Sequence, residues 1–126
     1  MHTYILRGKY SPEAFDGMLN DPSDRAPAAQ ALVEAIGGKM LGMYFSVSSN
    51  EIVALFTADS GQLAEAEMIL MASKAFSEIS TETLITTDQM FEAMRKGQRT
   101  RAAYQSANMD EIDRMLLDEY RDLNQN

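Results

Sequence analysis

Hydrophobic and polar residues alternate with a period of two in four segments of the chain, residues 3–9, 40–47, 52–56 and 79–85. Alternation combined with β-branched and aromatic residues is typical of strands. The middle two segments are separated only by Ser48-Ser49-Asn50, which can form a turn. We therefore predict four strands, with the middle two joined as a hairpin.

Helical spacing and helix-end signals occupy the segments between these strands. Ser11 and Pro12 suit the N-cap and first position of a short helix, which the turn-forming residues 20–24 should end. A second helix carries an apolar stripe of Ala29, Leu32, Val33 and Ile36, and Gly37-Gly38 should end it. After the hairpin, residues 59–61 begin a helix with one expected face of Ala64, Met68, Met71, Ala72 and Ala75.

The resulting order over residues 3–85 is β-α-β-β-α-β. This order predicts an α+β, ferredoxin-like domain in which one face of a four-stranded antiparallel sheet is covered by helices. In the hairpin, both expected faces are apolar: Leu41, Met43, Phe45 and Val47 on one, and Met40, Gly42, Tyr44 and Ser46 on the other. A sheet with one solvated face should have one polar face, so we expect a partner subunit, the C-terminal helices, or both to cover the second face.

The last third of the chain predicts a C-terminal helical extension. One helix should run through Met90, Phe91 and Met94 to about Lys96, where Gly97 interrupts it. Asn108 and Glu111 form a capping box for a second, amphipathic helix. Its apolar positions are Met109, Ile112, Leu116, Tyr120 and Leu123. We therefore divide the chain into a domain of residues 1–90 and an extension of residues 91–126.

Composition narrows the chemistry. The 126 residues include 11 Lys+Arg, 19 Asp+Glu, one His and no Cys or Trp, which gives a net charge of −8. Without cysteine, disulfides, thiolate nucleophiles and cysteine-ligated metals are excluded. His2 is the only imidazole and has no second metal ligand nearby in the sequence, so we expect no metal and no cofactor.

The charge and hydropathy also bear on partners. Phosphates repel a protein of this charge, so we expect no nucleic-acid or membrane binding. The basic cluster Arg95, Lys96, Arg99 and Arg101 is interpreted as a solvated helix face. No apolar run approaches the ~20 residues of a membrane span, and no export signal is present, so a cytoplasmic protein is expected.

The polar candidates for a ligand site lie on or near the strands. Glu51 begins the third strand beside Asn50, where it could accept a proton or hold a ligand with Tyr44 or Ser46, or else cap the hairpin. Tyr4 and Tyr10, like Tyr44, put hydroxyl groups on or near the sheet, where a phenol can orient a small ligand or only pack its ring. The ten methionines fit either an adaptable cavity or interface, or ordinary core filling.

Several short motifs, in this order, make residues 1 to about 90 resemble the GYD-domain family. They are Thr3-Tyr4-Ile5-Leu6, Asp21-Pro22-Ser23-Asp24-Arg25, Gly37-Gly38-Lys39, Gly42-Met43-Tyr44 and Thr81-Glu82-Thr83-Leu84. The Gly-x-Tyr-Asp signature itself falls on Ser48, Ser49, Asn50 and Glu51, where only the final acid is kept in kind. The resemblance implies a ferredoxin-like fold and association through the sheet as in dimeric α/β-barrel proteins, and it implies no particular activity.

The leading hypothesis is a homo-oligomer without assignable catalytic activity that binds a small apolar ligand. The alternative is an oxygenase-like or isomerase-like enzyme acting on a small apolar molecule between sheet and helices, with Tyr44, Ser46 and Glu51 as its polar groups. A third hypothesis is an adaptor that binds a partner through residues 108–123.

Overall fold

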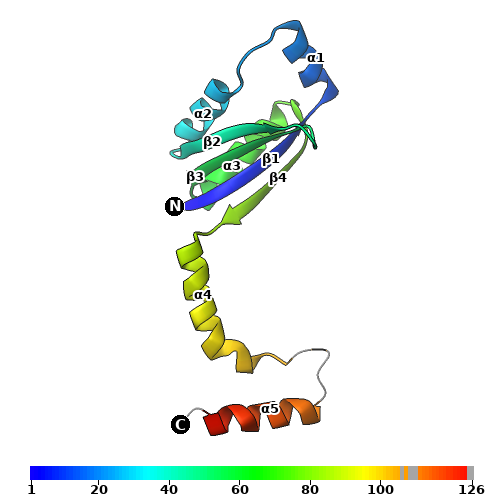
Figure 1. The fold of residues 1–126 in the computed structure, drawn as a ribbon. Coiled ribbons are helices and arrows are strands. Elements are labelled where there is room, and N and C mark those ends of the chain that lie inside the picture. The colour runs from blue at the N-terminus through cyan, green and yellow to red at the C-terminus, as the bar shows by residue number, and fades with distance from the viewer. Residues whose placement is uncertain (106, 108–110, 125–126) are drawn as a thin grey trace. The chain divides into compact units, whose positions relative to one another are not determined.

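The structure is a computed structural model that describes residues 1–105, 107 and 111–124 (Figure 1). The chain forms two compact units, Met1–Ile85 and Thr86–Asn126. The predicted boundary between residues 90 and 91 lies inside a helix of the second unit. Each unit is described by itself.

The first unit contains four strands and three helices. They are β1 (His2–Tyr10), α1 (Pro12–Asn20), α2 (Ala26–Ala35), β2 (Lys39–Ser46), β3 (Glu51–Ala58), α3 (Ser60–Ala72) and β4 (Phe76–Leu84). The strand order is β2-β3-β1-β4, and every neighbouring pair is antiparallel. The predicted α+β architecture with an antiparallel four-stranded sheet is confirmed.

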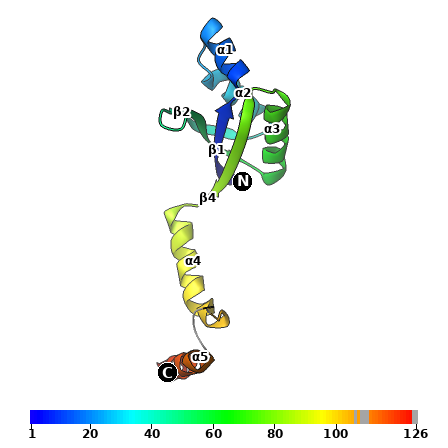
Figure 2. The same cartoon turned by 90° about the vertical axis from the view of Figure 1, so that its right-hand side faces the viewer.

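The core lies between the sheet and α2 and α3, which Figures 1 and 2 show on the same side of the strands. Alternation in β1 and β3 directs one set of side chains toward the helices. Tyr4 and Phe56 pack with ring centroids 5.8 Å apart, and Phe56 is only 2 % exposed. The complete buried apolar set is Tyr4, Leu6, Val33, Ile36, Ala54, Phe56, Ala58 and Ala66. The predicted stripe of α2 therefore faces the core.

Strand β2 departs from the predicted alternation. The register with β3 shifts between Met40 and Gly42, so Leu41 is the extra residue of a bulge. Met40 pairs with Phe56 and Met43 with Ala54, two positions on the helix-covered face. The expectation that Met40 and Met43 lie on opposite faces was therefore wrong. A bulge moves every later side chain of a strand to the other face.

Helix α3 buries a different stripe from the predicted one. Ala66 is buried and Leu63 and Leu70 pack against the core, whereas Met68 and Met71 are exposed. The apolar residues of this helix are spread round it rather than gathered on one side, so hydrophobic periodicity alone does not select its buried face. The expected face of Ala64, Met68, Met71, Ala72 and Ala75 was wrong for this reason.

Two glycines connect α2 to β2. Gly37 has a φ of 86°, the left-handed conformation predicted for the end of this helix. A Cβ atom on Gly38 would lie 2.2 Å from the carbonyl oxygen of Thr57 in β3. The second glycine thus permits a close backbone approach at the start of β2.

The second unit contains α4 (Thr87–Thr100), a 3-10 turn (Arg101–Ala103) and α5 (Glu111–Asn124). Helix α4 begins with a capping box between Thr86 and Gln89 and continues through Gly97, so the predicted interruption was wrong. One glycine in a helix costs only about 1 kcal/mol, which the other residues of α4 offset. Asn108, the predicted cap of the last helix, and Met109, one of its predicted apolar positions, lie outside the described residues. Among the described helices, none combines the length and hydropathy required to cross a membrane.

Candidate functional site

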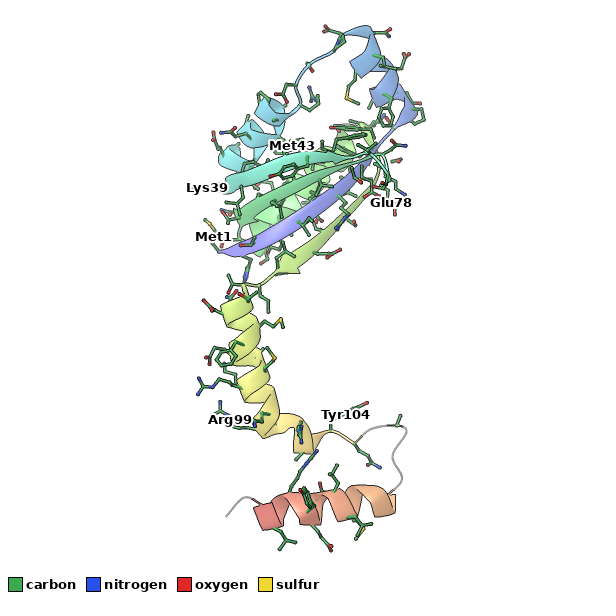
Figure 3. All side chains as sticks on the ribbon, in the orientation of Figure 1. Met1, Lys39, Met43, Glu78, Arg99 and Tyr104 are labelled. Atoms are coloured by element: carbon green, nitrogen blue, oxygen red, sulfur yellow. The ribbon has the colours of Figure 1, made fainter. Side chains whose placement is uncertain are left out.

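A hollow of about 400 Å³ lies at the end of the sheet where β1 leads into α1. This is the end of the sheet that Glu78 marks in Figure 3, opposite Lys39. Its lining residues come from β1, α1, the α1–α2 linker and the β2–β3 hairpin: Tyr10, Phe15, Met18, Leu19, Ser23, Asp24, Arg25, Ala26, Met43, Tyr44, Phe45 and Ile52. A second hollow of about 310 Å³ shares Tyr10, Met18, Ser23 and Arg25 with the first. Tyr10 and Arg25 therefore form the common wall of the two hollows.

Tyr10 is positioned by an irregularity in the β1–β4 pairing. Lys9 pairs with Glu78, but Tyr10 pairs with Phe76, so one residue of β4 is skipped. As a result, the rings of Tyr10 and Phe76 stack with centroids 4.9 Å apart. Phe15 of α1 meets the Tyr10 ring edge-on at 5.7 Å. These contacts hold the Tyr10 ring in place on two sides.

A glycine on β1 makes room for this stack. A Cβ atom on Gly8 would lie 2.8 Å from two ring carbons of Phe76. Any larger residue at this position would push the Phe76 ring, and with it the surface against which Tyr10 stacks. Gly8 therefore affects the shape of the hollow although it does not line the hollow itself.

Ser11 fixes the start of α1 next to Tyr10. Its backbone N–H donates to the carbonyl of Ala75 at 2.7 Å, and its hydroxyl accepts from the N–H of Ala14 at 3.1 Å. Ser11 is buried, as expected for an N-cap that also links α1 to the segment before β4. Helix α1 is thereby tied to the sheet end at which the hollow lies.

The α1–α2 linker supplies the polar side of the hollow. The Asp24 carboxylate accepts from the N–H of Ala26 at 2.9 Å and so caps the first turn of α2. Arg25 is exposed and occupies the N-cap position itself. The linker thus places one guanidinium group beside Tyr10.

The Tyr10 phenol is electrostatically perturbed. Burial raises the pKa of Tyr10 above its ordinary value of 10.0, and the charge of Arg25 and a hydrogen bond with it partly offset this effect. The phenol therefore stays protonated at neutral pH, where it can donate a hydrogen bond. Its two stacking partners and Arg25 determine where that donor lies.

Of the other predicted site residues, Tyr44 also lines the hollow, and the remaining four lie elsewhere. Tyr4 is 4 % exposed and belongs to the core. The Tyr44 ring lies over Gly42, as the distance of 3.2 Å between a Cβ atom added to Gly42 and the Tyr44 hydroxyl oxygen shows. Ser46 pairs with Glu51 at the hairpin end, and the Glu51 carboxylate lies 3.9 Å from the Lys9 ammonium group. Asn50 has a φ of 57° in the turn. Of the predicted residues, the hollow brings together only Tyr10 and Tyr44.

The sheet face opposite the helices forms the second candidate surface. Register places Ile5 of β1, Val53 and Leu55 of β3 and Tyr44 of β2 on this face. Ion pairs flank this apolar row: Arg7 with Glu82 at 3.2 Å, and Lys9 with Glu78 at 3.6 Å. No element of the first unit covers this face (Figure 1), and its cover by a partner subunit or by the C-terminal helices stays a prediction.

The most important residue of the hollow that sequence reasoning missed as a site residue is Arg25. It was noted only within the motif of residues 21–25, and nothing in that motif indicates contact with Tyr10. Phe15, Met18 and Leu19 follow helical i, i+3, i+4 spacing, which is a signal for an apolar face on α1. In the part of the chain that the structure describes, no group of three or more His, Cys, Asp and Glu is suited to hold a metal ion.

The element order and the strand order β2-β3-β1-β4 define a ferredoxin-like α+β domain. The chain belongs to the GYD domain family, whose model matches residues 4–94. A comparison with curated proteins gave no match. Among solved structures, this chain is similar to an uncharacterized NIPSNAP-like domain protein from Burkholderia xenovorans. The two chains share 16 % sequence identity, the match covers 68 % of this chain and 85 % of that chain, and the TM-score is 0.37.

Proposed function

We propose that this protein is a homo-oligomer whose copies associate through the open face of the sheet, and that the hollow beside Tyr10 binds a small apolar molecule. The observation that carries the association is the row Ile5, Val53 and Leu55, which lies on the sheet face that no element of the first unit covers. Burial of such a row is the main favourable term in protein association. We also propose a cytoplasmic location, because the chain has no cysteine to form the disulfides that are common in exported proteins.

The dimensions of the open face fit a second copy. Four strands at about 4.8 Å spacing and about eight residues at 3.3 Å each give a projected area of roughly 500 Å². Side chains that protrude from the sheet make its accessible surface larger than this flat projection. The accessible area therefore approaches the roughly 800 Å² per partner that specific interfaces bury.

The charges of this face also suit a second copy. Arg7 and Lys9 lie along β1, while Glu78 and Glu82 lie along β4. When two copies of such a face meet, the positive row of one copy can lie against the negative row of the other. The net charge of −8 would otherwise make two identical chains repel each other.

Multi-angle light scattering tests the association. We expect the mass of at least two chains for the unmodified protein and the mass of one chain for Val53→Glu, which places a carboxylate in the apolar row. Met68→Glu is the matched control, because Met68 is exposed on α3 and should leave the mass unchanged. A monomeric mass for the unmodified protein at micromolar concentration would refute the proposed association.

The binding role of the hollow has its own support. Its volume of about 400 Å³ lies within the roughly 300–1,000 Å³ typical of ligand sites. Its lining is mostly apolar and aromatic, with the few polar groups gathered on the linker side. Such a combination of an apolar wall and a small number of placed polar groups is typical of sites for small molecules.

Methionine methyl groups provide a local measure of binding. Met18 and Met43 line the hollow, whereas Met90 and Met94 belong to α4. With ¹³C-labelled methionine methyls, a bound apolar probe such as naphthalene should shift the resonances of the first pair and leave the second pair in place. Unchanged Met18 and Met43 resonances at probe saturation would count against a binding hollow.

A further inference from the structure

We propose that the ligand of the hollow is a small aromatic carboxylate, whose ring lies among the apolar side chains and whose carboxylate binds the guanidinium group of Arg25. The inference rests on the proposed binding of a small molecule in this hollow. It adds the chemical class of the ligand and the residue that selects it.

The apolar wall favours a flat, aromatic group. Phe15 and Met18 of α1 and Met43 and Phe45 of the β2–β3 hairpin contribute to this wall. Aromatic rings pack favourably edge-on or offset against other rings, and methionine sulfur makes favourable contacts with ring edges. The Tyr10 ring is held by Phe15 and Phe76, so this side of the wall is ordered before a ligand enters.

Arg25 is the group of the rim that could bind an anion. Arg25 is the only cationic residue that lines either hollow. Among the described residues, no ion pair involves Arg25. Two carboxylates also line the hollows, Asp24 in the first and Asp21 in the second; the Asp24 carboxylate accepts from the N–H of Ala26, and neither forms an ion pair with Arg25. The guanidinium group is therefore positioned on the rim with its charge not neutralised by an ion pair.

A second group at the rim, the Tyr10 phenol, suits a carboxylate. The Tyr10 phenol, which is protonated at neutral pH, can donate a hydrogen bond to an oxygen that Arg25 also contacts. A guanidinium group matches the two oxygens of a carboxylate with two parallel hydrogen bonds.

The protein as a whole is acidic, so the surroundings of the hollow do not favour an anion. At a net charge of −8, an anionic ligand is repelled from most of the surface. Retention of an anion in the hollow must therefore depend on the local positive group. Removal of Arg25 should then cost an aromatic carboxylate most of its affinity, while a neutral aromatic of the same shape should lose little.

The experiment compares 2-naphthoate with 2-naphthamide, two probes of nearly equal shape that differ in charge. Titrations of the full chain are followed by the ¹³C-methyl resonances of Met18 and Met43. We expect naphthoate to bind about tenfold more tightly than naphthamide, the effect of one exposed charge-assisted contact. Arg25→Gln should remove this preference, with a much smaller loss of affinity for naphthamide than for naphthoate.

Arg7→Gln is the matched control, because Arg7 lies on the open sheet face and should not alter either affinity. If both probes shift Met18 and Met43 with equal affinity, the carboxylate inference is refuted while the binding hollow stands. If neither probe shifts them, both fail. Naphthamide binding to Arg25→Gln shows that the variant is folded, and Arg25→Lys serves as a second variant that should keep part of the preference if charge is the cause.

Discussion

Substitution of alanine for Gly38 is expected to destabilise the sheet unit strongly. The added Cβ would lie 2.2 Å from the carbonyl oxygen of Thr57, against 3.4 Å or more for an ordinary contact. The two backbones would have to move apart by about 1 Å at the point where β2 joins β3. Val33 restricts such a movement, because its Cγ1 atom would lie 3.2 Å from the same Cβ.

The magnitude follows from the kind of atom that must move. Overpacking in a well-packed site costs about 1–3 kcal/mol, and the obstacle here is backbone of a paired strand rather than a flexible side chain. We therefore expect a loss of about 3 kcal/mol in the free energy of unfolding. A unit of this length typically has a total of about 4–13 kcal/mol, so the loss is a large part of its stability.

Urea unfolding followed by far-UV circular dichroism measures the effect. With a slope of about 1–3 kcal/mol per molar urea, the midpoint should fall by about 1–3 M. Gly61→Ala is the control: Gly61 lies in α3 with nothing near its added Cβ, so stability should hold or rise by up to about 1 kcal/mol. A loss below about 0.5 kcal/mol for Gly38→Ala would show that β2 and β3 are not held at this distance.

Lys74 follows α3 and has a φ of 62°, so Lys74→Gly should relieve about 1 kcal/mol of backbone strain and raise the thermal midpoint of unfolding. Ala64→Gly, inside α3, should lower that midpoint. Because burial raises the pKa of Tyr10 above 10.0, the unfolded chain releases this proton first, and stability measured by urea unfolding should fall as pH rises above about 10. Arg25→Gln should steepen that fall, since Arg25 lowers the Tyr10 pKa, and a shallower fall would contradict the assigned contact. Phe56→Ala should cost about 3–5 kcal/mol in calorimetry as a core truncation, and a cost below 1 kcal/mol would indicate that the core is misplaced.

The fold was predictable where one face of an element differs clearly from the other. Alternation in β1 and the stripe through Val33 and Ile36 in α2 both matched the buried sides. The structure extends β3 to Glu51–Ala58 and β4 to Phe76–Leu84, because pairing with β1 continues beyond the strongly apolar positions. Secondary structure is thus encoded locally, but its ends depend on partner strands.

The faces of β2 and α3 were not predictable, because both elements are apolar on more than one side. A bulge at Leu41 reverses which residues of β2 meet the helices, and no residue type in that strand requires a bulge. In α3, the small side chain of Ala66 lies nearest the sheet, a choice that tertiary packing makes among many apolar residues. Hydrophobic patterning loses its information where the pattern is uniform.

The candidate site was predictable only in part, for a similar reason. The sequence predicts Tyr10 as one of three phenols on or near the sheet, and the structure places it in the hollow. Its partner Arg25 belongs to a linker after another helix, and only the tertiary fold brings the two together. Asn50 and Glu51 lie at the hairpin turn instead, so proximity along the sequence was a poor guide to the composition of this site.

The bulge at Leu41 has a consequence for aggregation. Strand β2 is one edge of the sheet, and an edge with a regular row of unpaired N–H and C=O groups can template addition of a foreign strand. The bulge interrupts that row, while the other edge, β4, exposes Glu78 and Glu82 and is itself irregular opposite Tyr10. Growth of the sheet sideways into a fibre is therefore disfavoured at both edges, even though the hairpin is strongly apolar.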